Sequence, residues 1–333
     1  MKKLLIVSGL VLTMLCIIFA AGCITNGSSG NIVITNSDGT NVTLDKTAER
    51  VVLLNSNAGE ILYLLGDAGK VVGISQSIAN NAEQVKMYPN AVIVGTWNEP
   101  DVEYLISLDV DLVIGYASSK PKNAEVLASA GIPIVYIDCT KPETMSQDIV
   151  EVGKLSGNRE KAAKIAAYYE EVISEIESRV APISMTRSVY AESYTAYWGQ
   201  GAETGMGQLI SIAGGQNIMT DPSARKISDE WVVSTSPEII VKLVNNMDDP
   251  SASYDEVVSR AGFNTVDAVK NDRVWLLRND LTYGPRSCAA AVAVAKMIHP
   301  VLFEDMSVEG VLTEFNARFG TDFDVTGLTY PVL

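Results

Sequence analysis

The middle of the chain carries a long helical pattern without interruption. Over residues 158–180 (NREKAAKIAAYYEEVISEIESRV) apolar side chains recur every three or four positions, which places them on one face of a helix. Asn158 is a favoured N-cap residue, and Ala181-Pro182 ends the run. At about 1.5 Å per residue, this helix is about 35 Å long, the width of a small domain. We therefore expect one stiff helix, over 158–181, to join lobes at 49–157 and 182–333.

The segments on either side of this helix alternate between short apolar runs and helical patterns. Such alternation is typical of α/β proteins, whose sheets are mostly parallel. The predicted strands lie at 51–54, 71–74, 112–114, 134–137, 189–191, 239–241 and 274–277. We predict an α/β fold of two similar Rossmann-like lobes, with central and mostly parallel sheets, joined by the long helix.

Three sequence patterns occur once in each half, in the same order. Each is a helix, or a helix followed by a strand, and the pairs are 59–66 with 207–214, 103–114 with 230–241, and 123–138 with 264–278. One such match is weak, but three in one order predict two lobes of related topology.

Composition and charge exclude several classes of function. The chain has 333 residues, with 25 Lys and Arg against 40 Asp and Glu, so its net charge is −15. An acidic chain is poorly suited to nucleic acids, which are bound through basic patches. Its four Cys form no C-x-x-C pair, and its single His, His299, is expected at a helix end. Without a His cluster, a G-x-S-x-G motif or paired Cys, we predict no enzyme activity and no metal site or cofactor of its own.

The N-terminus has the pattern of a secretion signal. Lys2 and Lys3 precede an uncharged apolar run over 4–21, and Ala-Gly-Cys23 follows. Small residues before a Cys are typical of lipoprotein signals, so we predict a signal peptide over 1–23 and a lipid on Cys23. An uncleaved transmembrane anchor is the alternative. Either way, the remainder would lie outside the cell, tied to the membrane, with a tether and N-terminal segment over 24–48. Cys16 lies inside the signal, and the two cysteines that remain, Cys139 and Cys288, are expected to be buried free thiols.

Aromatic residues cluster just after the predicted strands of both halves. They are Trp97, Tyr116, Tyr194, Tyr197, Trp198 and Tyr283. If the lobes face each other, these loops open on one cleft, where aromatic faces suit a large, flat, partly apolar ligand. Arg286 follows the last strand and is expected to pair with an anionic group of the ligand. The glycine-rich segment 199–207 misses the dinucleotide-binding spacing by one residue, so we interpret it as a flexible loop at the cleft mouth.

Helix starts carry the remaining candidates. Asn57 and Glu60 fit the spacing of a capping box after the first strand. Glu103 and Glu230 each lie in the first turn of a predicted helix, where the helix dipole favours an acid. Because they occupy matched positions in the two halves, we also consider them as a pair of exposed charges that dock a basic partner.

These stretches together resemble the cobalamin- and iron-chelate-binding proteins of ABC importers, the class with a rigid helix between its lobes. The resemblance covers about 50–303 and rests on 55–62 (NSNAGEIL), 103–114 (EYLISLDVDLVI), 228–240 (SDEWVVSTSPEII) and 284–286 (GPR). Trp97, six residues before Glu103, and Tyr116, after DLVI, match aromatics of the vitamin B12 binder. The segments 109–111 (DVD) and 58–59 (AG) depart from the family pattern.

The resemblance implies a role in transport. It implies that Glu103 and Glu230 dock onto arginines of a permease dimer that works with ATPase subunits. It also implies that the cleft captures a cobalt- or iron-containing chelate, such as a corrinoid, a ferric siderophore or haem. A surface enzyme, or an adhesive or sensory module on the same scaffold, is the alternative.

Overall fold

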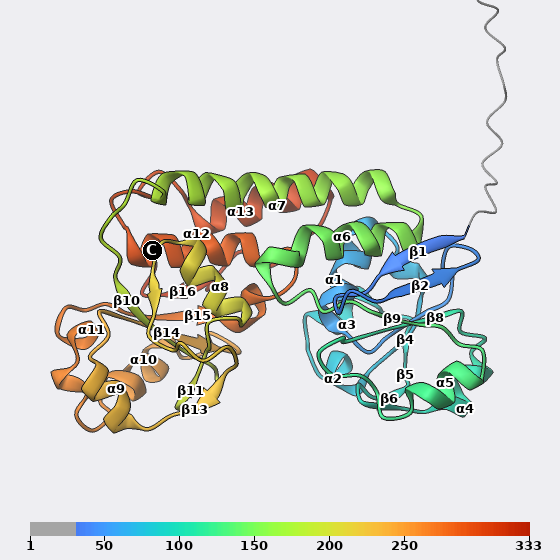
Figure 1. The fold of residues 1–333 in the computed structure, drawn as a ribbon, viewed down its shortest axis with the longest axis horizontal. Coiled ribbons are helices and arrows are strands. Elements are labelled where there is room, and N and C mark those ends of the chain that lie inside the picture. Colours follow the sequence, from blue (N-terminus) through green and yellow to red (C-terminus); the bar gives the residue numbers. More distant parts are fainter. Residues whose placement is uncertain (1–30) are drawn as a thin grey trace, which may run out of the picture.

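The computed structural model describes residues 31–333, and Figure 1 shows two lobes side by side below one long helix. The predicted signal peptide 1–23, its Cys23, and residues 24–30 of the tether lie outside the described residues. Within 31–333, no helix is both long and apolar enough to cross a membrane.

The N-lobe is built on a five-stranded sheet with the order β5-β4-β3-β8-β9. All neighbouring strands run parallel. The strands are β3 (Val51–Leu53), β4 (Val71–Ile74), β5 (Val92–Ile93), β8 (Leu112–Gly115) and β9 (Ile134–Tyr136). The helices among them are α1 (Ser56–Leu65), α2 (Gln76–Ala79), α3 (Gln84–Met87), α4 (Val102–Ser107) and α5 (Ala124–Ser129). A small hairpin of β6 (Gly95–Thr96) and β7 (Glu99–Pro100) precedes α4.

The C-lobe has a mixed sheet with the order β13-β11-β10-β14-β15-β16, and β12 also pairs with β10. Its centre is parallel, and its outer strands β11, β13 and β16 are antiparallel. The strands are β10 (Ser188–Glu192), β11 (Trp198–Gly199), β12 (Gln216–Asn217), β13 (Arg225–Lys226), β14 (Ile239–Val244), β15 (Val274–Arg278) and β16 (Thr329–Tyr330). The helices are α8 (Gly205–Ile212), α9 (Asp229–Thr235), α10 (Pro250–Val258), α11 (Asp267–Lys270), α12 (Ser287–Ile298) and α13 (Val308–Phe319).

The two lobes share one topology, as the repeated patterns predicted. The run β3-β8-β9 of the N-lobe corresponds to β10-β14-β15 of the C-lobe, and a further parallel strand flanks β3 and β10 alike. The matched patterns fall on α1 and α8, on α4-β8 and α9-β14, and on α5-β9 and α11-β15. The predicted fold class is therefore confirmed.

The long helix α7 (Arg159–Val180) lies within the segment 158–181 in which the sequence pattern predicted it. It packs against α6 (Pro142–Ser156) on the N-lobe side and against α12 on the C-lobe side. Its apolar face, with Ile165, Tyr169 and Ile176, belongs to one continuous hydrophobic cluster that includes Leu62 of α1 and Val292 of α12. Burial of apolar surface on this scale holds the lobes to one scaffold.

Residues 31–48 form part of the N-lobe. The antiparallel hairpin of β1 (Ile32–Thr35) and β2 (Asn41–Leu44) packs β1 against α6, and its buried Ile34 and Leu44 belong to the large hydrophobic cluster. The tether and N-terminal segment predicted over 24–48 is therefore folded from residue 31 onward. Cys139 and Cys288 are buried free thiols, as predicted, and His299 is the C-cap of α12.

Candidate functional site

A polar cavity of about 420 Å³ lies between the lobes. It opens where parallel strands of both sheets end, the usual place for a ligand in open α/β sheets. Ser56 and Asn57 follow β3, Tyr116 follows β8, and Thr140 follows β9. From the C-lobe, Asn245 follows β14, and 279–286 follows β15. Both lobes thus contribute loops to one site.

The N-lobe wall is held by the start of α1 and by a pair of aromatic rings. The N-cap of α1 is Asn55, whose Oδ1 accepts from the backbone N–H groups of Asn57 and Ala58. Tyr116 places its hydroxyl 3.3 Å from Ser56 Oγ. Trp97 meets Tyr116 edge to face, with 6.3 Å between ring centroids. The capping box predicted for Asn57 and Glu60 is therefore wrong, because Asn55 is the cap and Glu60 points elsewhere.

The C-lobe wall carries three aromatic side chains. Tyr283 lines the central cavity and also an adjoining cavity of about 360 Å³. Tyr194 and Trp198 line this second cavity, and they are 58% and 41% exposed. Large aromatic rings left this open to solvent inside a cleft are suited to contact a ligand.

Tyr197 lies away from the described cavities. It packs against a separate core of the C-lobe, and the Arg260 guanidinium sits 4.6 Å from its ring centre. The sequence grouped Tyr197 with its neighbours Tyr194 and Trp198, but a positive φ of 57° at Tyr197 sets its backbone apart from a regular strand. Four of the six predicted aromatics thus line these cavities, whereas Trp97 packs between Tyr116 and a core of the N-lobe.

The glycine-rich segment 199–207 is closely packed. A Cβ added at Gly201 would lie 2.4 Å from the carbonyl oxygen of Ser223, and one at Gly207 would lie 2.1 Å from that of Gly201. Backbone bonds from Ala202 and Glu203 also tie the segment to 221–222. The interpretation as a flexible loop is therefore corrected, because glycine here permits close approach of backbone to backbone.

Arg286 lies at the floor of the central cavity, with its charge already paired. It is 1% exposed, and its Nη2 donates to Glu60 Oε2 at 2.9 Å across the lobe boundary. Its Nη1 donates to Asp280 at 3.0 Å, and the Phe323 ring lies 4.5 Å from its Cζ. The structure therefore gives the guanidinium protein partners where the sequence suggested an anionic ligand.

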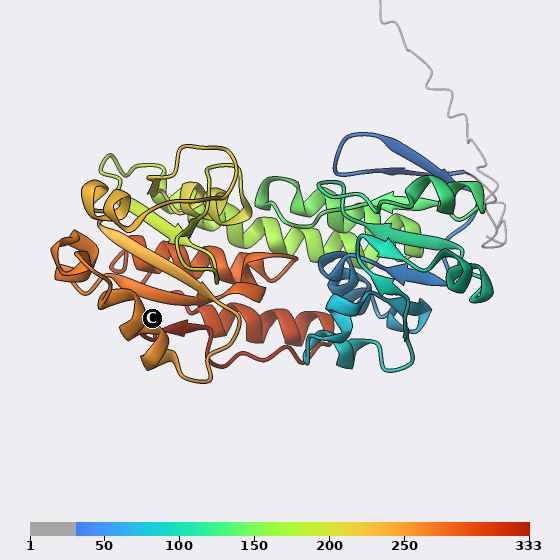
Figure 2. The same ribbon diagram turned by 90° about the horizontal axis from the view of Figure 1, so that it is seen from below.

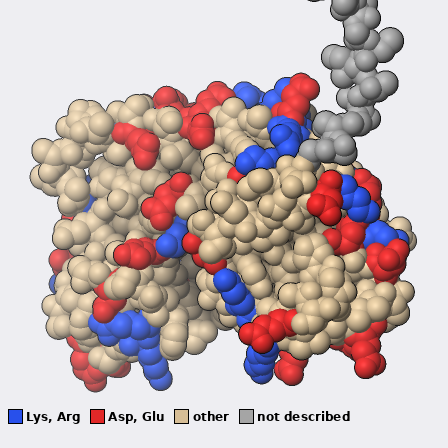
Figure 3. Space-filling model, turned by 45° about the vertical axis from the view of Figure 1, so that its right-hand side comes forward, with Lys and Arg blue, Asp and Glu red and all other residues tan. Residues whose placement is uncertain are grey.

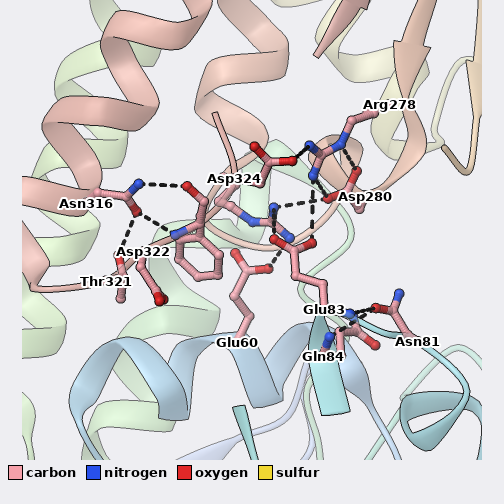
Figure 4. Close-up of polar contacts among 12 residues, drawn as sticks. Glu60, Asn81, Glu83, Gln84, Arg278, Asp280, Asn316, Thr321, Asp322 and Asp324 are labelled. Atoms are coloured by element: carbon pink, nitrogen blue, oxygen red, sulfur yellow. Dashed lines mark hydrogen bonds and ion pairs between the residues drawn. The ribbon is translucent and has the colours of Figure 1, made fainter. Parts of the chain in front are cut away.

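A second arginine extends this ion cluster, as Figure 4 shows. Arg278 binds Asp280 at 2.6 Å and Asp324 at 3.4 Å, and Glu83 of the N-lobe lies 3.7 Å from it. Burial raises the pKa of Glu60 despite the nearby Arg286. Burial also acts to raise the pKa of Asp280, but bonds from Arg278 and the charge of Arg286 hold it at about 2. The cluster joins α1 and the α2–α3 region to the C-lobe.

Carboxamide side chains form the part of the cavity that the sequence analysis missed. They are Asn57, Asn81, Gln84, Asn245 and Asn279. Three of the five, Asn57, Asn245 and Asn279, come within four residues of a strand end, and this is the one signal that the sequence offers for them. Polar residues are common in all loops, so that signal is weak without the fold.

Glu103 and Glu230 lie on corresponding elements, far from the long helix. Glu103 is in the first turn of α4, capped by Asp101, and Glu230 is in the first turn of α9, capped by Ser228. Both side chains are exposed. In Figure 1, α4 and α9 lie at the outer ends of the two lobes, on the side opposite α7. The two acids thus mark one face of the molecule, once per lobe.

Charges on the surface are interspersed. On the face that Figure 3 shows, Lys and Arg lie among Asp and Glu on both sides of the groove between the lobes. Among residues 31–333, no group of three or more His, Cys, Asp or Glu side chains is placed to hold a metal ion.

Solved structures share this architecture. The TroA-like periplasmic binding protein FepB from Veillonella parvula is 25% identical, has a TM-score of 0.72, and aligns over 86% of this chain and 96% of its own. The molybdate periplasmic binding protein MolA from Haemophilus influenzae is 17% identical, has a TM-score of 0.75, and aligns over 88% and 99%. At that identity, MolA shows the fold alone. The class defined by fold and site is a two-lobed periplasmic binding protein.

The sequence places the chain in a family. The model of the periplasmic binding protein family Peripla_BP_2 matches residues 51–281, more than half of the chain, so the protein belongs to this family. A vitamin B12-binding protein of Yersinia pestis is 26% identical over 151 residues, which are 44% of this chain and 54% of the relative. The chain thus spans about half the length of the curated relatives it matches.

Proposed function

We propose that the protein is the extracytoplasmic substrate-binding component of an ABC importer, and that it captures a metal chelate between its lobes. The observation that carries the proposal is the cleft at the strand ends, with Tyr116, backed by Trp97, on one wall and Tyr194, Trp198 and Tyr283 on the other. Such walls suit a corrinoid, a ferric siderophore or haem. The FepB-type fold and the B12-binding relative support the same class.

Delivery would use the two matched acids. We propose that Glu103 and Glu230 meet basic residues of a permease dimer that works with ATPase subunits. One exposed acid per lobe, on one face, fits a partner made of two like subunits. Charge pairs of this kind guide association and fix orientation more than they add affinity.

We further propose that a lipid on Cys23 holds the protein to the outer face of the membrane. The Ala-Gly-Cys sequence after an apolar run supports this, and residues 24–30 then lead to the folded lobe at β1. The folded part itself would perform no chemistry on its ligand.

The docking role is tested with the double variant Glu103→Ala, Glu230→Ala in a reconstituted transporter. Chelate affinity should stay unchanged, whereas uptake and ATP hydrolysis stimulated by the binding protein should fall at least tenfold. The control replaces two exposed acids of α7, Glu160 and Glu177, and should transport normally. Wild-type uptake in the double variant would reject the docking role, and lost chelate affinity would show that the acids act on the fold or the ligand.

The binding role is tested by quenching of tryptophan fluorescence with cyanocobalamin, haemin and ferric siderophores. Trp97→Ala should weaken binding by about fivefold to tenfold, since one stacked aromatic contributes on the order of 1 kcal/mol beyond its buried area. If none of these compounds binds at micromolar concentration, the chelate assignment fails. A catalytic turnover of any of them would favour the enzyme alternative.

A further inference from the structure

The five carboxamides of the central cavity hold unused hydrogen-bonding groups. Asn279 Oδ1 is buried and has no partner among the described residues. Asn81 uses its Oδ1 to accept from two backbone N–H groups of the α2–α3 region, which leaves its Nδ2 as a donor. Asn245 likewise accepts through Oδ1 from Asn279, at 3.4 Å. Gln84 borders the same cavity, beside Asn81 in Figure 4.

This lining offers donors and acceptors together. Each Asn or Gln group has two donor hydrogens and one acceptor oxygen. A buried acceptor such as Asn279 Oδ1 is costly to leave unbonded, so a ligand that donates to it gains free energy on binding. Because the carboxamides come from both lobes, Asn57, Asn81 and Gln84 from one and Asn245 and Asn279 from the other, a ligand would be held across the cleft.

Positive charge is not available to a ligand in this cavity. The described side chains that line it include two carboxylates, Glu60 and Asp280, against one guanidinium, Arg286, which binds both. The adjoining aromatic cavity is lined by one cation, Lys141, and one acid, Glu203, so its lining carries no net positive charge. An anion placed in the central cavity would lose its hydration and face more acidic than basic groups, which is unfavourable in a partly buried site.

We infer that the cleft selects an uncharged or cationic chelate that presents amide groups, and that it discriminates against anionic chelates and oxyanions. The inference rests on the proposed binding function and narrows it. Amide groups of the ligand donate to Asn279 Oδ1 and accept from the carboxamide N–H groups of Asn81 and Asn245. The rings of Tyr116, Tyr283, Tyr194 and Trp198 cover the ligand's apolar faces.

The experiment compares ligands of different charge on the purified chain by isothermal titration calorimetry. The panel contains cyanocobalamin, which is uncharged and carries amides, and ferrioxamine, a cationic hydroxamate with amides. It also contains haemin, a ferric tris-catecholate and molybdate, which are anionic. We expect at least one of the first two to bind in the micromolar range or tighter, and the anions to bind at least tenfold more weakly.

Two substitutions at one position test the charge argument. Gln84→Glu adds a negative charge and removes a hydrogen-bond donor, so the affinity for the uncharged ligand should fall about fivefold to tenfold. Gln84→Lys should raise the affinity for haemin or molybdate at low ionic strength, and salt should reduce the gain. The matched controls Gln216→Glu and Gln216→Lys change an exposed residue outside the cavities and should alter neither ligand class.

The possible outcomes distinguish a failure of this inference from a failure of the proposed binding function. Binding of an anionic chelate with no binding of the amide-bearing pair overturns the inference and leaves the binding function standing. Equal effects at Gln84 and Gln216 also overturn it, because the cavity lining would then have no special role. If no member of the panel binds, the proposed function fails and the inference falls with it.

Discussion

At the scale of single residues, the Glu60–Arg286 pair joins two segments that lie 226 positions apart in the sequence. Both side chains are almost fully buried, and Arg286 also holds Asp280. Two buried charges are tolerable because each neutralises the other and shares its hydrogen bonds. The pair therefore fixes how the start of α12 meets α1, directly below the cavity.

Arg286→Met should reduce the free energy of unfolding by about 3–5 kcal/mol, because Glu60 and Asp280 would be left buried without their common partner. The double variant Glu60→Gln, Arg286→Met should recover part of this loss. Urea unfolding followed by circular dichroism measures both. A single variant as stable as the wild type would show that the pair contributes little.

Asp148 gives the structure a dependence on pH. Its carboxylate is 2% exposed and accepts from Ser37 Oγ and the Cys139 backbone N–H, and burial raises its pKa to about 6. A raised pKa means that the folded state holds the proton more tightly than the unfolded state does. The contribution of Asp148 to stability is therefore largest below about pH 4 and falls as the pH rises to about 6.

The variant Asp148→Asn should remove this slope. Its stability relative to the wild type should increase between pH 4 and pH 6, by at most about 3 kcal/mol, and stay constant above that range. Urea unfolding at a series of pH values measures the difference. The control Asp45→Asn changes an exposed side chain and should follow the wild type at every pH. If the stability of Asp148→Asn plotted against pH ran parallel to that of the wild type, the prediction would be contradicted.

Much of the site at this scale was within reach of the sequence. The aromatic residues follow strand ends, and four of the six line the cleft, with Trp97 behind Tyr116. Tyr197 was misplaced because, in a bent segment, it packs on a core while its neighbours Tyr194 and Trp198 face the cleft. Glu60 was misread as a cap because its true partner is distant in sequence, and no local pattern encodes such a pair. The carboxamides were missed because amides are unremarkable in loops.

At the scale of elements, α6 and α7 meet at an unusually close contact. A Cβ added at Gly153 of α6 would lie 2.2 Å from the Cβ of Ala162 on α7. Small residues on both helices let the backbones approach, and α6 thereby carries the N-lobe onto the long helix. The sequence predicted α7 from its periodicity, but it did not give α6 or the β1–β2 hairpin, whose positions depend on packing against other elements.

Gly153→Ala should lower the free energy of unfolding by about 1–3 kcal/mol, because overpacking at this contact outweighs the better helix propensity of alanine. The double variant Gly153→Ala, Ala162→Gly moves the methyl group to the other helix and should recover stability. A cycle of the four proteins in urea should give a coupling of about 1 kcal/mol or more. Additive effects would mean that the helices separate without cost.

At the scale of the whole molecule, the lobes are joined by more than one helix. The hydrophobic cluster runs through α1, α6, α7, α8 and α12, and a backbone bond from Gly284 to the Cys139 carbonyl crosses the floor of the cleft. Seen from below in Figure 2, the C-terminal helices extend from one lobe towards the other. Tyr63 of α1 donates to Asp322 after α13, at 2.9 Å. A wide hinge motion would break these contacts together.

We therefore predict that ligand binding leaves the radius of gyration unchanged within the error of small-angle X-ray scattering. The comparison is made between the apo protein and the protein saturated with the ligand that binds most tightly. A hinge rotation of the lobes on binding would instead change the scattering profile at low angle. That result would contradict the prediction and show that the shared core does not hold the lobes rigidly.

The placement of α4 and α9 has a mechanical consequence. Both helices lie at the free ends of the lobes, and α7 joins the lobes at the opposite side. A partner that binds both ends, as proposed for the permease, therefore applies its force far from α7, the helix about which the lobes would have to rotate. A small force applied at Glu103 and Glu230 would therefore strain the cleft most on the side away from α7. In this arrangement the partner supplies the energy that opens the cleft, and the binding protein can keep a high ligand affinity until the partner binds.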